Sequence, residues 1–243
     1  LGFLVVGVCL GEGMGVNGAV AHAFVDVFFK GLLFMCMGAV VYRVGHCDAS
    51  HLGHLRKSMP FTTVCCLIGA LSICGVPLFS AFITKSMVMS EAASQGYGGI
   101  WLVLVFASAC VLHHAGIKIP FFAFFGHDHG VRCEKAPLNM RVAMGMSATV
   151  CVVIGVYPPL LYDLLPSPVA YEPYDLSHVS TQLQLLAWST LALTFMMVKK
   201  IDPPELRATN LDVDWLWRVP AKGLALRIAR WSLRLQEWIN AGS

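Results

Sequence analysis

Runs of about twenty nearly uncharged residues recur along this chain, and they constrain its fold more than any other feature. An α-helix needs about 20 apolar residues to cross the ~30 Å hydrocarbon core of a bilayer. Of the 243 residues, 57% are hydrophobic and 13% are charged, whereas soluble domains carry about 25% charged residues. The runs lack the alternation that transmembrane strands require. We therefore predict an all-α fold, a polytopic bundle of transmembrane helices.

Five membrane spans are expected after a short apolar stretch from Leu1 to Leu10. This stretch has no initiating Met and no basic n-region, so we interpret it as the tail of an interrupted helix whose earlier part precedes residue 1. Gly- and Pro-rich connections separate the spans. The expected spans are Val16–Tyr42, Met59–Ala93, Gly99–Phe125, Val142–Leu165 and Thr181–Val198.

The basic residues predict an orientation for these spans. Of the 17 Lys and Arg residues, most fall in alternate loops, and the intervening loops carry acids such as Glu12, Asp163, Glu172 and Asp175. The positive-inside rule then places the basic loops and the C-terminus in the cytoplasm. The basic loop residues are Arg43, Arg56 and Lys57; Arg132, Lys135 and Arg141; and Lys199, Lys200, Arg207, Arg218, Lys222, Arg227, Arg230 and Arg234.

Three lysines, Lys30, Lys85 and Lys118, lie inside the expected spans. A lysine at mid-bilayer costs at least ~2.5–3.5 kcal/mol on insertion scales, so each needs a partner or water. Snorkelling to the interface is an alternative for Lys118, which is near a span end. His22, Asp26 and Lys30 are spaced i, i+4, i+8 and share one helix face. This column is predicted to be either a proton relay or a static buried ion pair.

The second span is too long for a single crossing. Met59–Ala93 contains 35 residues, or roughly 52 Å as one helix, against ~30 Å of hydrocarbon. Gly75-Val76-Pro77 lies near its middle, where proline removes a backbone donor. We expect a discontinuous helix broken at Gly75 and Pro77, with Lys85 about two turns beyond the break, because transporters place such breaks beside hydrated cavities. A kinked but continuous helix is the alternative.

The third span carries His113, His114 and Lys118, and His114 and Lys118 share a face. These residues are predicted to be either relay groups or hydrogen-bonded core residues. A different class of function would use His22 with His113 or His114 as axial ligands of a haem in a membrane cytochrome.

No metal or cofactor is expected from the other motifs. His127-Asp128-His129 offers two imidazoles in a turn, which form an incomplete metal site. The nine cysteines form no C-x-x-C pair and lie mostly in apolar runs, as small buried residues do. No nucleophile–base pair, phosphate loop or redox motif predicts catalytic chemistry in this chain.

Several segments, in the same order along the chain, resemble the antiporter-like subunits shared by Mrp-type cation/proton antiporters and respiratory complex I. His22–Phe34 is similar to the H-x3-H-x-x-F-K-A-L-L-F helix of that family, and His51–Pro60 resembles its L-G-G-L-x-x-x-M-P loop. Gly75–Lys85 resembles its broken helix, G-x-P-x-x-x-G-F-x-x-K/E, and Phe121–Gly126 resembles the F-F-G that closes the next helix. The resemblance covers roughly residues 1–165.

The resemblance implies a proton-translocating subunit of a multisubunit Na+/H+ antiporter, nearest to the D-type subunit, in a prokaryotic inner membrane. A membrane subunit of an NADH-quinone oxidoreductase or a membrane-bound hydrogenase is the alternative, and electron transfer would then lie in other subunits. The implied partners are other membrane subunits and protons, with Na+ as the exchanged cation of an antiporter. Lys30 would belong to the central hydrophilic axis, Lys85 to the broken helix, and His22 to the relay. Three positions depart from the family pattern: Asp26, Ala81 and Ser86.

The composition changes after the last span, which predicts two domains, residues 1–200 in the membrane and 201–243 as a cytoplasmic tail. Pro203–Trp215 looks like an extension of some D-type subunits. An apolar stripe and a charged stripe then alternate at helical spacing, which is typical of an amphipathic helix on the membrane surface; docking on a partner subunit is the alternative. The apolar stripe is Leu224, Ile228, Trp231, Leu235 and Trp238, and the charged stripe is Arg227, Arg230, Arg234 and Glu237.

Overall fold

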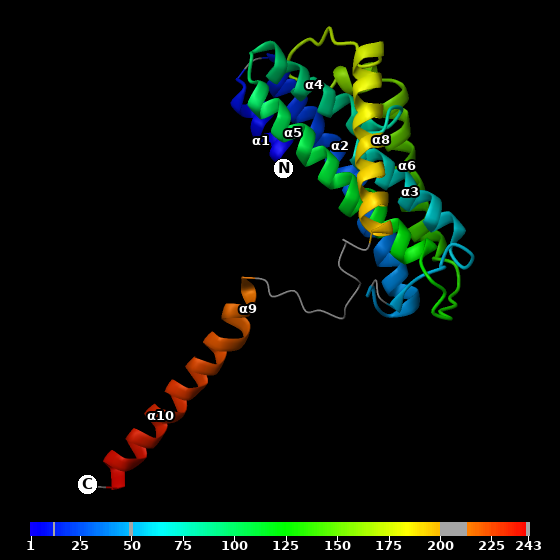
Figure 1. The fold of residues 1–243 in the computed structure, drawn as a ribbon. Helices are drawn as coiled ribbons and strands as arrows, with labels where there is room; N and C mark the ends of the chain where they lie inside the picture. The colour runs from blue at the N-terminus through cyan, green and yellow to red at the C-terminus, as the bar shows by residue number, and fades with distance from the viewer. Residues whose placement is uncertain (12, 49–50, 200–212, 242–243) are drawn as a thin grey trace. The chain divides into compact units, whose positions relative to one another are not determined.

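The computed structural model describes residues 1–11, 13–48, 51–199 and 213–241, and every regular element within these ranges is a helix (Figure 1). The chain divides into two compact units, Leu1–Pro204 and Glu205–Ser243. The all-α class is therefore confirmed. The first unit contains α1 (Gly2–Cys9), α2 (Gly13–Val44), α3 (Pro60–Cys74), α4 (Ser80–Ser94), α5 (Gly98–Val111), the π-helices η2 (Leu112–Lys118) and η3 (Phe121–Phe125), α6 (Leu138–Val156), α7 (Pro159–Tyr162) and α8 (Leu176–Val198).

Within the described residues, three helical segments are long and apolar enough to cross a membrane: Gly13–Val44, Gly98–Phe125 and Leu138–Val156. They correspond to the first, third and fourth expected spans. The second expected span is the pair α3 and α4, with an interruption between Cys74 and Ser80, so the discontinuous helix is present. The fifth corresponds to α8, which is 23 residues long. The chain is an integral membrane protein with a helical bundle.

The fourth span was predicted with the wrong boundaries. The helix runs from Leu138 to Val156, not from Val142 to Leu165. It ends early because Tyr157 is followed by two prolines, which cannot supply the backbone donors that a continuing helix needs, and the short helix α7 begins separately at Pro159. Arg43 and Arg141 also lie inside α2 and α6 and not in loops.

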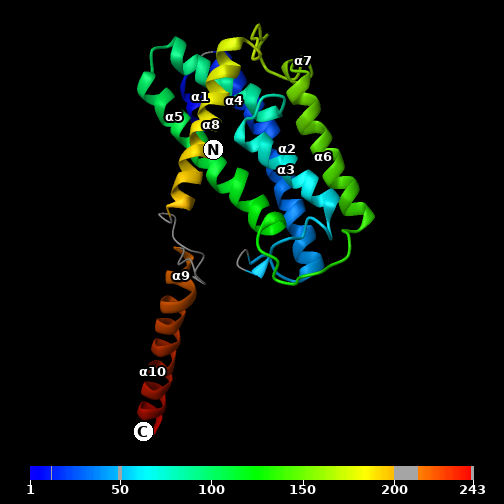
Figure 2. The same ribbon diagram turned by 45° about the vertical axis from the view of Figure 1, so that its right-hand side comes forward.

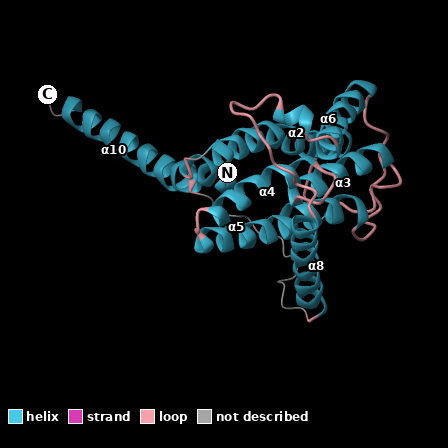
Figure 3. Cartoon of the chain, turned by 90° about the horizontal axis from the view of Figure 1, so that it is seen from above, coloured by secondary structure: helices cyan, strands magenta, loops and turns pink. Residues whose placement is uncertain are grey.

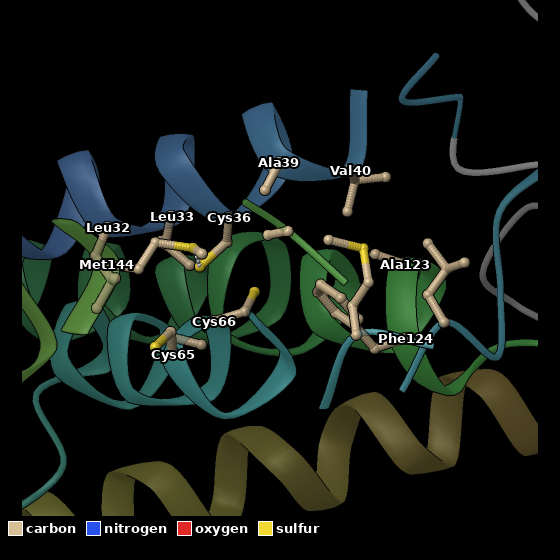
Figure 4. Close-up of a cluster of buried hydrophobic side chains, with 14 of the residues drawn as sticks. Leu32, Leu33, Cys36, Ala39, Val40, Cys65, Cys66, Ala123, Phe124 and Met144 are labelled. Atoms are coloured by element: carbon tan, nitrogen blue, oxygen red, sulfur yellow. Dashed lines mark hydrogen bonds between the residues drawn. The ribbon is translucent and has the colours of Figure 1, made fainter. Parts of the chain in front are cut away.

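Helix α2 is the centre of the bundle and packs against α1, α3, α4 and α6 (Figures 2 and 3). The largest buried cluster lies between α2, α3, η3 and α6 (Figure 4). In it, Cys36, Cys65 and Cys66 are buried, and the Cys36 thiol donates to the Met144 sulfur at 3.6 Å. These cysteines pack as small apolar side chains, as their positions in apolar runs predict.

The connections lie alternately at the two ends of the bundle. In Figure 1 the α4–α5 turn and the chain before α8 are at one end, and the chain after α2 and after η3 is at the other. The first end carries Asp163, Glu172 and Asp175; the second carries Arg56, Lys57 and Lys135. The bundle therefore has an acidic end and a basic end, and we use these two names below.

The second unit contains α9 (Asp214–Leu216), η4 (Trp217–Ala221) and α10 (Lys222–Ala241). Leu224, Ile228 and Trp231 of the expected apolar stripe are exposed in this unit. Several residues named from the sequence lie outside the described part: Glu12, Lys200, Arg207 and residues 203–212, together with the side chains of Leu235, Glu237 and Trp238.

Candidate functional site

The break between α3 and α4 is the centre of the site. Gly75 caps α3 in the left-handed conformation (φ 73°), and Leu78 has φ 75°. A left-handed conformation is unfavourable for a leucine, so the surrounding structure must hold it. Two glycines on neighbouring helices make room: a Cβ at Gly155 of α6 would overlap the Leu78 backbone, and one at Gly116 of η2 would overlap the Cys74 sulfur.

Side chains from other helical turns satisfy the backbone carbonyls that the break leaves free. The Lys85 Nζ donates to the Ile73 carbonyl at 2.7 Å, and the Gln182 Nε2 of α8 donates to the Cys74 carbonyl at 3.2 Å. Non-helical backbone at membrane depth is tolerated only where such partners exist. Lys85 and Gln182 therefore stabilise the break, and the freed carbonyls in turn supply the hydrogen-bond acceptors for these two buried side chains.

Lys85 is a buried ammonium held by neutral groups. Its side chain, on a residue only 5% exposed, also donates to the Ser108 hydroxyl of α5 at 3.2 Å. The Nζ lies 5.5 Å from the centre of the Phe3 ring, a cation–π contact. Within the described residues it makes no direct ion pair, although the Asp26 carboxylate acts on it electrostatically. A carbonyl dipole, a hydroxyl and an aromatic face therefore stabilise this charge.

His22 converges on the same region from α2. It is buried, and its Nδ1 lies 2.8 Å from the Thr84 Oγ1, with the donor set by the imidazole tautomer. Its ring contacts Phe3 at 5.7 Å and Phe29 at 6.1 Å between centroids. Phe3 thus touches both His22 and Lys85. Close packing of α2 on α4, where Gly18 faces Val88, brings the two titratable groups together.

The predicted column on α2 divides into two parts. Asp26 and Lys30 form an ion pair at 2.7 Å, with side chains 19% and 39% exposed respectively. They lie one and two turns from His22 on the same helix, but only His22 is buried against α4. The His22–Lys85 region and the Asp26–Lys30 pair are therefore distinct environments.

His113, His114 and Lys118 lie in η2, which has π-helical geometry. The two imidazole centroids are 4.8 Å apart. Lys118 lines a cavity of about 210 Å³ between η2, η3 and α8. Single-turn π-segments often mark functional sites, and this one packs against the C-terminal end of α3 through Gly116.

Reasoning from the sequence missed three polar residues of the site, Thr84, Ser108 and Gln182, and one buried acid elsewhere on α4, Glu91. The first three contact predicted residues or the break, but an isolated hydroxyl or amide in an apolar run gives no distinctive signal. Glu91 of α4 is buried and accepts from the Gln95 amide at 2.8 Å. The rule that singled out the intramembrane lysines would have found Glu91 if it had been applied to acids as well.

Asp128 of the His127-Asp128-His129 triplet forms an ion pair with Arg132. Arg132 binds both Asp128 carboxylate oxygens, at 2.9 and 2.7 Å, and the Gly130 amide donates to one of them at 2.9 Å. The Arg132 hydrogen bonds and the Gly130 amide hold the pKa of Asp128 well below its ordinary value. Among the described residues, no three His, Cys, Asp or Glu side chains converge as metal ligands would.

Comparisons with known sequences relate this chain to membrane antiporter subunits. Residues 1–112 match the family described as NADH:quinone oxidoreductase/Mrp antiporter, transmembrane. A Staphylococcus aureus protein (strain MRSA252), named as a candidate antiporter subunit mnhD2, is 30% identical over 166 residues, 68% of this chain and 33% of that protein. The mnhD2 protein of strain JH9 is 29% identical over the same length. The chain thus spans about a third of the length of the curated relatives it matches.

Comparison with solved structures gives the same fold. A chain of the Mrp complex from Dietzia sp. DQ12-45-1b superposes with a TM-score of 0.67 at 18% identity, covering 98% of this chain and 26% of that one. A chain of an archaeal respiratory membrane complex, the membrane-bound sulfane sulfur reductase, gives a TM-score of 0.61 at 23% identity, covering 86% and 36%.

Proposed function

Because the chain contains an antiporter-like membrane segment of the kind shared by Mrp antiporters and complex I, we propose that it is the proton-translocating part of a multisubunit Na+/H+ antiporter. Protons would pass along His22, Asp26, Lys30, Lys85, His113, His114 and Lys118. The membrane subunits of the same complex would be its partners. The antiporter assignment follows the names of the relatives in Staphylococcus aureus.

The observation that carries this proposal is the position of Lys85 beside the helix break, where its Nζ donates to the Ile73 carbonyl. A lysine that served packing alone would be costly at this depth, whereas a titrating amine needs hydrogen-bond partners that tolerate both of its charge states. The Ile73 carbonyl and the Ser108 hydroxyl, at 2.7 and 3.2 Å, are such partners, because neither is a fixed negative charge. His22 and Thr84 beside it extend the chain of polar groups into α2.

Two features support the orientation and the tail. The loops at the basic end favour the cytoplasmic side for that end under the positive-inside rule, in a prokaryotic inner membrane. The exposed Leu224, Ile228 and Trp231 of α10 and the arginines between them suit a helix on an anionic membrane surface.

The proposal is tested by ion flux in vesicles that contain the intact complex. Lys85→Met should reduce Na+-driven proton movement by on the order of 100-fold, as the loss of a proton-transfer group does. Lys57→Met removes the same charge from an exposed loop and should transport normally. Equal transport by both variants would refute the proposal.

A respiratory subunit is the second candidate, favoured by the fold match to the archaeal respiratory complex. Proton movement would then require an electron donor and not a Na+ gradient, which the same vesicles distinguish. A haem protein, the third class, would show a Soret absorption band when purified.

A further inference from the structure

A cavity of about 200 Å³ lies between α4, α5 and α8. It follows α4 from Phe82 to Ala93, a separation of eleven residues, which is roughly 16 Å of helix. Ala93 is one residue from the end of α4, and this end of α4 lies at the acidic end of the bundle (Figure 1). The cavity, which Ala93 lines, therefore extends to the acidic end. Its polar lining residues are Ser86, Ser90, Ser177, His178, Thr181 and Gln182.

A titratable cluster lies along this cavity. The Ser90 hydroxyl is 3.1 Å from His178 Nε2 and 3.1 Å from the Tyr171 hydroxyl. The Nδ1 of His178 is buried and has no hydrogen-bond partner among the described residues. Buried polar atoms are normally satisfied by protein or by water, and a cavity of this volume accommodates several water molecules. His178 therefore borders a space suited to water.

One side chain separates the inner end of the cavity from Lys85. Gln182 lines the cavity and donates to the Cys74 carbonyl, while Lys85 donates to the adjacent Ile73 carbonyl. A Cβ built on Gly75 would lie 3.2 Å from the Gln182 Nε2 and 3.7 Å from the Lys85 Nζ. Gln182 and Lys85 thus face the same glycine. The absence of a side chain at Gly75 keeps the two polar groups close to one another.

We propose that this cavity is a hydrated access path between Lys85 and the aqueous phase at the acidic end, with His178 as its proton-exchanging group and Gln182 as the residue that positions its inner end. The inference rests on the proposed function and adds residues of α8 to it. Water in the cavity can pass a proton to His178 Nε2 through the Ser90 hydroxyl, which accepts one proton and donates its own, and the imidazolium returns a proton to the cavity by the same route.

Among the described side chains, Ser90 and Tyr171 make contacts with His178. Ser90 faces it from α4, and Tyr171 faces it from the connection before α8, with ring centroids 5.6 Å apart. The carboxylates adjacent in sequence are Glu91, which follows Ser90 on α4 and accepts from Gln95, and Asp175, the residue before α8.

Hydration of the path is tested without any transport assay. Ser90→Cys places a thiol in the cavity, and a charged methanethiosulfonate is added from one side of vesicles containing the intact complex. We expect the introduced thiol to be modified rapidly from the side of the acidic end, as read by peptide mass spectrometry. The buried Cys36 and Cys66 should stay unmodified in the same molecules. An introduced thiol as unreactive as these two would overturn the proposal.

The roles of Gln182 and His178 are tested by flux. Gln182→Leu should slow proton movement about tenfold, the effect of one lost hydrogen bond, whereas Gln184→Leu, on the exposed face of the same helix, should not. His178→Phe should slow it and flatten its pH profile, and the exposed His129→Phe should do neither. If Gln182→Leu and His178→Phe transport normally while Lys85→Met does not, the access path is wrong and the proposed function stands. If Lys85→Met is also normal, the proposed function is wrong.

Discussion

Lys85 and Lys30 are both membrane lysines, but the structure stabilises their charges in opposite ways. Lys30 pairs with Asp26 at 2.7 Å within one unbroken helix, and its side chain is 39% exposed. Lys85 is buried and bonds to a carbonyl and a hydroxyl beside a broken helix. A fixed negative partner holds a lysine protonated, whereas dipoles allow either state. Under the proposed function, this difference favours Lys85 over Lys30 as the proton-exchanging group.

The largest expected effect tests whether the break is what makes Lys85 different. Gly155→Leu would force a side chain into the Leu78 backbone, so the break must shift. We expect a loss of about 3 kcal/mol or more in the free energy of unfolding, as for severe overpacking, measured by denaturation in detergent. Gly145→Leu on the same helix meets only the end of the Phe61 ring and should be nearly neutral. Equal effects of both variants would mean that the break is not tightly held.

The next effect tests whether Lys30 depends on its carboxylate. Asp26→Asn leaves the ammonium without its charge partner, and we expect a loss of about 2 kcal/mol, less than for a fully buried pair because Lys30 is 39% exposed. Replacing both, Asp26→Asn with Lys30→Met, should restore part of this loss. A double variant less stable than Asp26→Asn alone would contradict the ion-pair account.

A smaller effect is expected at the contact that joins α2 to Lys85's helix. Thr84→Val removes the partner of the buried His22 Nδ1 and should cost about 1–2 kcal/mol of unfolding free energy. Thr190→Val is the control, because the Thr190 hydroxyl is exposed and bonds to its own helix. Equal stability of Thr84→Val and the native protein would argue against a structural link between His22 and α4.

The smallest effect is expected for an exposed ion pair that has the same i, i+4 spacing as Asp26 and Lys30. Asp128 and Arg132 are 2.7 Å apart, also at i, i+4, and Arg132 lowers the pKa of Asp128. The lowered pKa means that this pair stabilises the fold above the ordinary pKa of an aspartate and loses that effect as pH falls through the lowered value. Arg132→Ala should therefore raise the pKa of Asp128, as read by its carboxyl NMR shift. If the titration of the Asp128 carboxyl is unchanged in Arg132→Ala, the Asp128–Arg132 pair cannot serve as the comparison for the Asp26–Lys30 pair.

Much of the fold was predictable because an apolar segment that crosses the bilayer must satisfy its own backbone hydrogen bonds, which favours a helix. The apolar runs predicted the helices, and the excessive length of Met59–Ala93 together with Pro77 predicted the break. The helix end at Val156 was missed because the sequence stays apolar beyond Tyr157. Pro158 and Pro159, however, have no backbone N–H to continue the helical hydrogen bonds. The i, i+4 spacing also predicted the Asp26–Lys30 pair.

The surroundings of Lys85 could not be predicted in the same way. Ser108 and Gln182 come from helices far along the chain, and their contacts depend on how the helices pack. The role of Phe3 depends equally on the packing of α1 against α2 and α4. Residue pattern predicts which groups share a helix face, but not which face meets which neighbour.

The account's central claim, that transport needs an amine at the position of the Lys85 ammonium, is tested most directly by restoring one chemically. Lys85→Cys should lose proton movement in vesicles containing the intact complex, and treatment with aminoethyl methanethiosulfonate should restore a large part of it. Ethyl methanethiosulfonate, of similar size but without the amine, should restore none. Treating the native protein with both reagents controls for modification of its own cysteines. Full transport by Lys85→Cys, or equal rescue by both reagents, would contradict the claim.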